Sequence, residues 1–392
     1  MISILLATLL QAPAPPAMTL ADAWQSALQH RGLAHSVRAD IAAASAGVRL
    51  AGQAPNPTLS ASYTGAAPRG HLLLDQPLSW MLTNGADGDV ARAAQLRSRI
   101  DSTVQLARLG ADVRRAFYGA LGRTERHRLL GDQQAIADSV LRIARRRYQA
   151  GDVSQFEVDQ VELESKLQSQ LLFAEADEVA VSRIALASAI AWPDASLPPL
   201  DGSLDDGLSD ASIPEPGPDL PAVLAAQADS SVAALSVHSA ERTRIPFPSL
   251  QLGTEWNDPA DPGHVFAVVG LAIPVPIWNH GGAQVAQAQA RADGAGAQVI
   301  EARMASRRSI EEARIRLSGT TTRALFARDS LIPAATRLRT RALAAYRAGE
   351  TGLVPVLEAI RREREVQLGE IEALIAFQDA VASLQDLLGV TP

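Results

Sequence analysis

Helical periodicity dominates the distribution of apolar and polar residues along the chain. Residues 86–149 contain no proline and are rich in Ala, Arg, Leu and Gln, which are good helix formers. Residues 283–348 have a similar composition and a single proline, Pro333. A proline inside a helix removes a backbone hydrogen bond and costs about 3 kcal/mol, so the sequence predicts a kink or local distortion at Pro333.

Each of these stretches is followed by a second helical segment with a narrow apolar stripe, a pattern typical of coiled-coil packing. The first stripe consists of Phe156, Leu163, Leu167, Leu171 and Ala174, and the second of Leu357, Ile360, Ile371, Leu374, Val381, Leu384 and Leu388. Between the paired segments lie Gly151 and Gly349, where the chain must reverse, because glycine accepts a positive φ after a helix. The sequence therefore predicts two long antiparallel helical hairpins. One further helix per half is expected, at residues 20–52 and 220–243.

Shorter stretches alternate between polar and apolar residues, as strands do. Residues 58–64 and 249–256 alternate clearly, residues 265–273 form a run with strong β-propensity, and residues 71–80 are its weaker counterpart. Turn-rich stretches at residues 66–70 and 257–263 separate the strands. We expect one β-hairpin per half, at residues 57–80 and 248–278. Strands of about ten residues, the length that crosses a membrane when tilted, would fit these ranges.

The two halves are copies of one unit. Tyr148-x-Ala150-Gly151-Asp152 is echoed by Tyr346-x-Ala348-Gly349-Glu350, and the proline-rich entry to the first strand recurs before residue 249. A separation of 198 residues relates both Trp80 to Trp278 and Gly151 to Gly349. The segment between tryptophan and glycine is thus of constant length, equivalent to a helical rod of roughly 100 Å. We assign residues 18–192 to the first repeat, 193–217 to a linker or surface-covering segment, and 218–392 to the second repeat.

Four strands cannot close a barrel, and an open strand edge is costly in lipid because its N–H and C=O groups lack partners. Three chains would supply twelve strands, an even number that closes a pore. The predicted fold is therefore mainly α with a small β part. Its duplicated hairpins would trimerise into an α-barrel and a twelve-stranded transmembrane β-barrel. The aromatics expected at or near strand ends suit a membrane-interface belt, or alternatively are ordinary core residues: Tyr63, Trp80, Trp256 and Trp278.

Composition narrows the possible functions. The formal net charge of −7 argues against nucleic-acid binding, which usually needs a basic patch. The absence of cysteine excludes disulfides, thiolate metal sites and a lipid anchor on an N-terminal cysteine. No apolar run is long enough for a transmembrane helix. Residues 2–10 fit the apolar core of a secretory signal peptide over residues 1–17, with cleavage after Ala14 or Ala17; the alternative is a disordered start of a cytosolic protein.

Catalytic and cofactor motifs were sought and not found. The seven histidines show no metal-ligand spacing, and the phosphate-loop, dinucleotide-binding and nucleophile-elbow patterns are absent. We therefore expect no enzyme activity, cofactor or bound metal. The basic clusters Arg145–Arg147 and Arg361–Arg362 beside the predicted hairpin ends are either solvated helix faces or docking surfaces.

The repeated order of helix, β-hairpin and long helical hairpin resembles the TolC-like outer-membrane efflux protein family. Residues 19–28 are similar to the family's opening helix, and residues 55–60 to its entry into the first strand. Residues 273–282 are similar to its exit from the last strand, especially in the heavy-metal and drug efflux branches. The resemblance covers nearly the whole chain from Thr19 onward. Two departures are the missing lipid-bearing cysteine and His30-Arg31-Gly32, which replaces an Asn-Pro after the opening helix.

This resemblance implies a homotrimer whose β-barrel contacts outer-membrane lipid and whose α-helical barrel extends into the periplasm. It would be a passive exit duct of a tripartite efflux or type I secretion system, coupled to a periplasmic adaptor and an inner-membrane pump. The implied adaptor-docking tips are Tyr148, Ala150, Gly151, Asp152, Tyr346, Ala348, Gly349 and Glu350. The alternatives are a periplasmic coiled-coil adaptor or an enzyme. The sequence does not identify the transported substrate.

Overall fold

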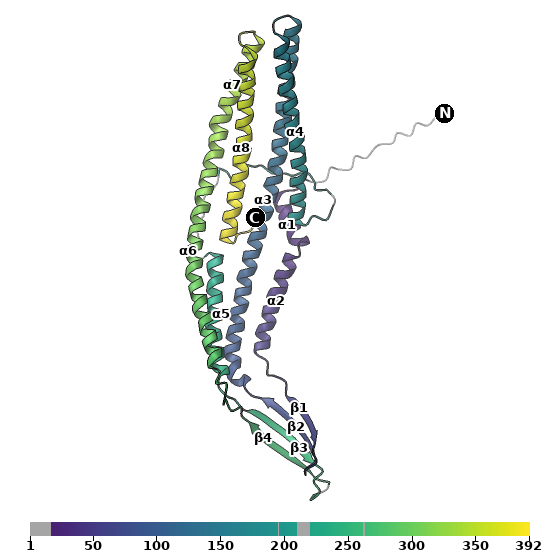
Figure 1. The fold of residues 1–392 in the computed structure, drawn as a ribbon, viewed down its shortest axis with the longest axis vertical. Coiled ribbons are helices and arrows are strands. Elements are labelled where there is room, and N and C mark those ends of the chain that lie inside the picture. Colours follow the sequence, from purple (N-terminus) through teal and green to yellow (C-terminus); the bar gives the residue numbers. More distant parts are fainter. Residues whose placement is uncertain (1–16, 195, 210–219, 262) are drawn as a thin grey trace, which may run out of the picture. The chain divides into compact units, whose positions relative to one another are not determined.

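A computed structural model describes residues 17–194, 196–209, 220–261 and 263–392 (Figure 1). The chain is mostly helical with one small antiparallel sheet, so the predicted fold class is confirmed at this level. No helix in these described ranges combines the length and the apolar character needed to cross a membrane. The expected signal peptide lies almost wholly outside the described residues, as do residues 210–217 of the expected linker.

The chain divides into two compact units that do not follow the sequence repeats. The first unit comprises Met1–Ala34, Leu106–Glu215 and Ile310–Pro392, and the second comprises His35–Gln105 and Pro216–Ser309. Each unit therefore draws on both halves of the sequence. The boundary between the units passes through two long helices, α3 (Trp80–Gln149) and α6 (Gly282–Phe326).

Two helical hairpins form most of the first unit. The last part of α3 is followed by α4 (Gln155–Ile190), and α7 (Ile332–Arg347) is followed by α8 (Leu353–Leu388). Between α6 and α7 a short π-helix, η1, spans Ala327–Leu331. It ends just before Pro333, so the predicted local distortion is confirmed. Widening the helix over one turn accommodates a proline that has no N–H to donate and that crowds the preceding turn.

Buried acids tie the helices of the first unit together. The Glu164 carboxylate on α4 pairs with Arg361 on α8 at 2.5 Å, and Glu175 on α4 pairs with Arg126 on α3 at 2.9 Å. Glu363, which is almost fully buried on α8, pairs with Arg339 on α7. A buried carboxylate without a cation would be strongly destabilising, so these pairs fix which helices can lie side by side.

The apolar stripe predicted on α4 does not pack inside the hairpin. Phe156, Leu163, Leu167 and Leu171 are between 45% and 68% exposed, and α4 buries a different face that includes Val158 and Val161. At about 100° per residue, the two faces lie roughly a third of a turn apart. The residues of the stripe on α8, in contrast, are all buried or half-buried. The α4 pattern correctly predicts a helix, but it does not identify the face that packs within one chain.

The helix expected at residues 20–52 is two helices, so this prediction was wrong in detail. In the first unit α1 (Leu20–His30) begins with a capping box in which Thr19 and Asp22 exchange hydrogen bonds. It ends at Arg31, whose backbone is extended, and α2 (Leu33–Ala51) follows Gly32. An extended residue followed by glycine stops helix propagation. The corresponding helix of the second half, α5 (Pro221–Thr243), is continuous.

The segment after α4 is held against the helices. Met18 forms a parallel bridge with Leu200, and its N–H donates to the Pro199 carbonyl at 2.7 Å. The buried amide of Gln378 on α8 donates to the carbonyls of Leu204 and Asp206. Over its described part, the stretch expected to be a linker or surface cover thus belongs to the packed first unit.

The second unit contains the sheet, whose strands lie in the order β1-β2-β3-β4, all antiparallel (Figure 1). The strands are β1 (Thr58–Tyr63), β2 (Gly70–Pro77), β3 (Ser249–Trp256) and β4 (Val265–Ala272). Pairing of β2 with β3 joins the hairpins of the two repeats into one sheet. With six to eight residues, the strands are shorter than the expected ten. Prolines flank them, including Pro57, Pro248 and Pro274, and a proline cannot donate to the ladder.

Candidate functional site

The two hairpin tips close with the same backbone geometry. After α3 the Gly151 N–H donates to Tyr148 O and the Asp152 N–H donates to Arg147 O, both at 2.9 Å. After α7 the Gly349 N–H donates to Tyr346 O at 3.1 Å, and the Glu350 N–H donates to Ala345 O at 2.9 Å. Both glycines have positive φ, 81° and 77°. Each tip is thus a Schellman turn, which needs a left-handed residue after the helix.

Seven of the eight residues expected at the tips are exposed, and Tyr346 is the exception. Tyr148 is 45% exposed, whereas Tyr346 is fully buried in an apolar cluster with Val140, Val158 and Val356. The sequence motif treats the two tyrosines as equivalent, but the structure places one on the surface and the other between the hairpins. Tyr346 therefore cannot present its ring to a partner in this conformation.

Arg147 contacts the buried tyrosine. Its guanidinium lies over the Tyr346 ring, 4.7 Å from the centroid, and donates to the Tyr346 carbonyl at 3.2 Å. At the equivalent position of the second repeat the sequence has Ala345. Burial raises the pKa of Tyr346 and nearby Glu157 raises it further, whereas Arg147 lowers it. A cation over an aromatic ring is worth about 0.5–2 kcal/mol, so Arg147 links the two hairpins.

The other arginines of the basic clusters form ion pairs or are exposed to solvent. Arg145 pairs with Glu162 at 3.2 Å, and Arg146 is exposed. Arg362 pairs with Glu358 and Glu365 along its own helix. These contacts favour the solvated-face interpretation for Arg145 and Arg362, whereas Arg147 has an internal role. The sequence pattern could not separate Arg147 from its neighbours, because the signal lies in a contact between residues 199 positions apart.

The sheet of the second unit has two chemically distinct faces. Register and alternation place Leu59, Leu72, Leu74, Leu250, Leu252, Val265, Val269 and Leu271 on one face. This apolar face carries no Asp, Glu, Lys, Arg or His in the four strands, and most of its large side chains are exposed. The opposite face carries every such residue of the strands, His71, Asp75 and Glu255, together with Ser60, Ser62, Ser249 and Gln251. We call these the apolar face and the polar face.

Aromatic residues lie beyond both ends of the apolar face. At one end Gly70 pairs with both Tyr63 and Trp256, and a Cβ on Gly70 would approach the Trp256 ring to 2.2 Å. At the other end Trp80 is the first residue of α3, not a strand residue, and Trp278 lies after β4 with 91% of its surface exposed. None of the four is classed as buried within the described chain.

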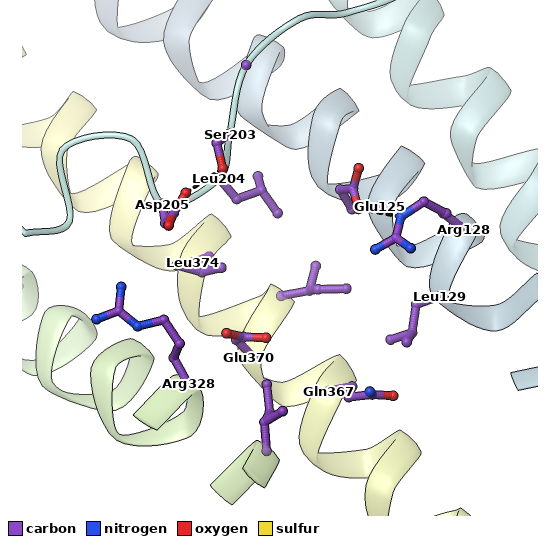
Figure 2. A pocket seen from close by; sticks show the side chains of 13 residues that line it. Glu125, Arg128, Leu129, Ser203, Leu204, Asp205, Arg328, Gln367, Glu370 and Leu374 are labelled. Atoms are coloured by element: carbon purple, nitrogen blue, oxygen red, sulfur yellow. Dashed lines mark hydrogen bonds and ion pairs between the residues drawn. The ribbon is translucent and has the colours of Figure 1, made fainter. Parts of the chain in front are cut away.

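A cavity of about 470 Å³ lies within the first unit, against the π-helix, and both charged and apolar side chains line it (Figure 2). Figure 2 shows Arg328 from η1 and Glu370 from α8 on its lining, with Asp205 nearby. Burial raises the pKa of Glu370, Arg328 lowers it, and Asp205 raises it. Cations and acids both line this cavity, so its charge favours no single class of ligand.

Known proteins share this architecture. In sequence the chain is 25% identical over 307 residues to the cobalt-zinc-cadmium resistance protein CzcC of Cupriavidus metallidurans, covering 75% of this chain and 71% of that protein. In structure it is similar to the outer membrane protein VceC of Vibrio cholerae, with a TM-score of 0.75, 16% identity, and coverage of 95% of this chain and 96% of that chain. It is also similar to the open MtrE outer membrane channel of Neisseria gonorrhoeae, with a TM-score of 0.74, 14% identity, and coverage of 95% and 89%. No protein-family profile matches the chain. The fold that the repeated motifs predicted is therefore confirmed.

The tip geometry predicts that Gly151→Ala and Gly349→Ala each destabilise a turn by about 1–2 kcal/mol, because an L-residue is strained at this φ. Around Gly151 no atom lies within 4 Å of an added Cβ, so the backbone alone causes the cost there. Amide hydrogen exchange at Asp152 and Glu350 should accelerate accordingly. The control is Gly131→Ala inside α3, where alanine should stabilise the helix by up to about 1 kcal/mol. Unchanged exchange at both tips would contradict the Schellman assignment.

Replacing Arg147 should loosen the contact between the hairpins. We expect Arg147→Met to cost about 1–2 kcal/mol through loss of the cation–π contact. It should also raise the pKa of Tyr346, because Arg147 lowers that pKa now. An ultraviolet titration of phenolate measures this, with Tyr346→Phe identifying the Tyr346 step. Because the folded-state pKa is already raised, stability from neutral Tyr346 is complete below about pH 10 and is lost at higher pH.

Arg146→Met is the matched control, since Arg146 is the exposed neighbour on the same helix. It should change stability by less than about 0.5 kcal/mol and leave the tyrosine titration unaltered. Equal effects of the two substitutions would show that net charge at the tip matters and that the contact with Tyr346 does not.

Proposed function

We infer that this chain is a TolC-like outer-membrane efflux protein, the exit channel of a tripartite efflux system. The fold shared with outer-membrane channels over almost the whole chain supports this function. So does the sequence relationship to CzcC. A periplasmic adaptor is not supported, because the structures that match are outer-membrane channels. We also infer that the chain has no enzyme activity and moves its cargo passively.

The observation that carries this proposal is the two-faced sheet. The apolar face has no charged side chain in the four strands, whereas the polar face has all three of the strands' acidic and histidine residues. Lipid on one side and a water-filled lumen on the other favour this division. The aromatics near both ends of the apolar face suit the two membrane interfaces. We therefore propose Tyr63, Trp80, Trp256 and Trp278 as interface residues.

The sheet also supports trimerisation. Strands β1 and β4 each have one edge that pairs with no other strand in the described part of the chain, because the order β1-β2-β3-β4 leaves them at the margins. Free edges are unfavourable in lipid, and neighbouring copies can satisfy them. Three copies of the four-stranded sheet would make twelve strands and close a pore. We propose this homotrimer in the outer membrane, with the helical hairpins extending into the periplasm.

The exposed stripe on α4 supports the same assembly. Phe156, Leu163, Leu167 and Leu171 form a coiled-coil seam without a partner helix in one chain. A neighbouring copy that covers this seam would bury apolar surface that is otherwise left in water. We propose that the seam packs against the adjacent chain of the trimer.

The hairpin tips are proposed as the docking site for a periplasmic adaptor, which in turn connects to an inner-membrane pump. Small exposed residues at Ala150, Gly151, Ala348 and Gly349 leave the backbone accessible at both turns. Asp152 and Glu350 add exposed negative charge. The name of the CzcC relative makes divalent metal ions a first hypothesis for the cargo.

One experiment tests the channel assignment directly. Protein from fractionated membranes should migrate as a heat-sensitive trimer of the outer-membrane fraction on an unboiled gel. In planar bilayers it should conduct potassium ions. Introducing charge into the seam with Leu163→Glu and Leu167→Glu should prevent trimer formation. Ala180→Glu should not, because Ala180 is exposed on the same helix and lies on neither the seam nor the buried face. A soluble, non-conducting monomer for the wild-type protein would refute the proposal.

The two faces of the sheet give a second, sharper test with adjacent valines on β4. Val269 lies on the apolar face and is 74% exposed, whereas Val268 lies on the polar face. We expect Val269→Arg to cost about 2–4 kcal/mol in lipid and to reduce outer-membrane insertion strongly. Val268→Arg should still insert, because it would face the lumen. Equal insertion of the two variants would contradict the proposed lipid-facing side.

A further inference from the structure

The polar face of the sheet carries one histidine beside a glutamate, His71 and Glu255. The Oδ2 atom of the other acid on this face, Asp75, accepts hydrogen bonds from Ser249 at 2.8 Å and from Gln251 at 2.9 Å. Glu255 has one partner among the described residues, the Nδ1 atom of His71 at 3.3 Å. The His71 Nε2 atom lies 3.4 Å from the Thr64 hydroxyl.

The separation of His71 and Glu255 fits two kinds of contact. At 3.3 Å the two atoms form a long hydrogen bond. Two ligands of one tetrahedral ion, each about 2.05 Å from the metal, are about 3.3–3.4 Å apart. A divalent ion could therefore replace the shared proton without moving the two atoms apart.

The chain provides its own contrast in a second histidine–acid pair at the same end of the sheet. In the loop after β3, His264 Nδ1 lies 2.6 Å from Asp261 Oδ1. At this distance the two atoms share a proton, and they are too close to bind one ion together without rearrangement. The spacing at His71 and Glu255 is thus not a general feature of histidines in this chain.

Neighbouring groups could complete a coordination shell. Ser62 on β1 pairs in register with His71, which pairs with Glu255, so the three side chains form a row across the polar face. A serine hydroxyl and water are suitable additional ligands for a weakly held ion. Among the described residues no group of three or more His, Asp and Glu gathers as a metal site, so each chain offers two strong ligands only. A site with two strong ligands is expected to bind an ion weakly and to release it readily.

We propose that His71 and Glu255 form a transient binding site for divalent transition-metal cargo on the lumen side of the sheet. Imidazole with carboxylate suits zinc or cobalt ions, whereas magnesium prefers an all-oxygen shell. The site rests on the proposed function, because only a channel lumen brings cargo to this face. It deepens that function by naming the class of cargo, and a trimer would hold three such sites.

The test uses the purified detergent-solubilised trimer and zinc ions alone. Isothermal titration should find one saturable site per chain for zinc and none for magnesium. Both His71→Ala and Glu255→Gln should weaken zinc binding by about tenfold or more. His264→Ala is the matched control and should leave the affinity unchanged. Cobalt titrated into the same protein should give a visible absorption band that His71→Ala removes.

The results of these measurements can refute the metal site without refuting the channel assignment. If the wild-type protein conducts potassium but binds no zinc, or if His71→Ala and His264→Ala behave alike, the metal site is refuted and the channel stands. If zinc binds through His71 in a protein that forms no trimer and conducts nothing, the lumen placement is refuted together with the proposed function. Saturable zinc binding that depends on both His71 and Glu255 in a conducting trimer supports the inference.

Discussion

The free edges of the four-stranded sheet are the constraint on which the rest of the structure depends. A backbone N–H or C=O group without a hydrogen-bond partner costs several kcal/mol in lipid, and β1 and β4 each present a row of them. One chain cannot remove both edges, because its two hairpins already pair with each other through β2 and β3. The apolar face of the sheet adds to this cost. It suits contact with lipid, where unpaired backbone groups are least tolerated. Identical copies are the simplest source of partners, which is why we propose an assembly.

The helical hairpins show a second consequence of the internal duplication of the sequence. Each repeat supplies one hairpin, and within a chain the two hairpins meet through buried ion pairs such as Glu164 with Arg361. In a ring built from duplicated chains, every hairpin has a second neighbour that belongs to another copy. The exposed seam on α4 lies about a third of a turn from its buried face, which is the arrangement such a helix needs. The exposed seam on α4 and the free edges of the sheet would thus both be covered by a neighbouring copy of the chain.

Sequence reasoning recovered the parts of the fold that depend on local physics. The long proline-free stretches, the alternation in residues 249–256 and the glycine turns each follow from backbone preferences, and Pro333 did mark a distortion. The break after His30 was missed because a single extended arginine before a glycine leaves little trace in a helical composition. Strand lengths were overestimated because the expected hairpin ranges include flanking prolines and turn residues that do not join the ladder. The exposure of the α4 stripe could not be read from periodicity, which locates an apolar face but does not identify the surface that covers it.

The tip residues illustrate the limit of a repeat-based prediction. Tyr148 and Tyr346 occupy the same place in the motif, yet the ring of Tyr346 is buried beneath Arg147 whereas Tyr148 remains exposed. Tyr346 packs against the first hairpin of its own chain, and the position equivalent to Arg147 in the second repeat is Ala345. If hairpins alternate around a trimer, the contact within a chain therefore has an arginine–tyrosine link that the contact between chains lacks. In such a ring the tips of neighbouring chains would be held together without this link, and the two contacts of each hairpin would differ although the repeats are alike.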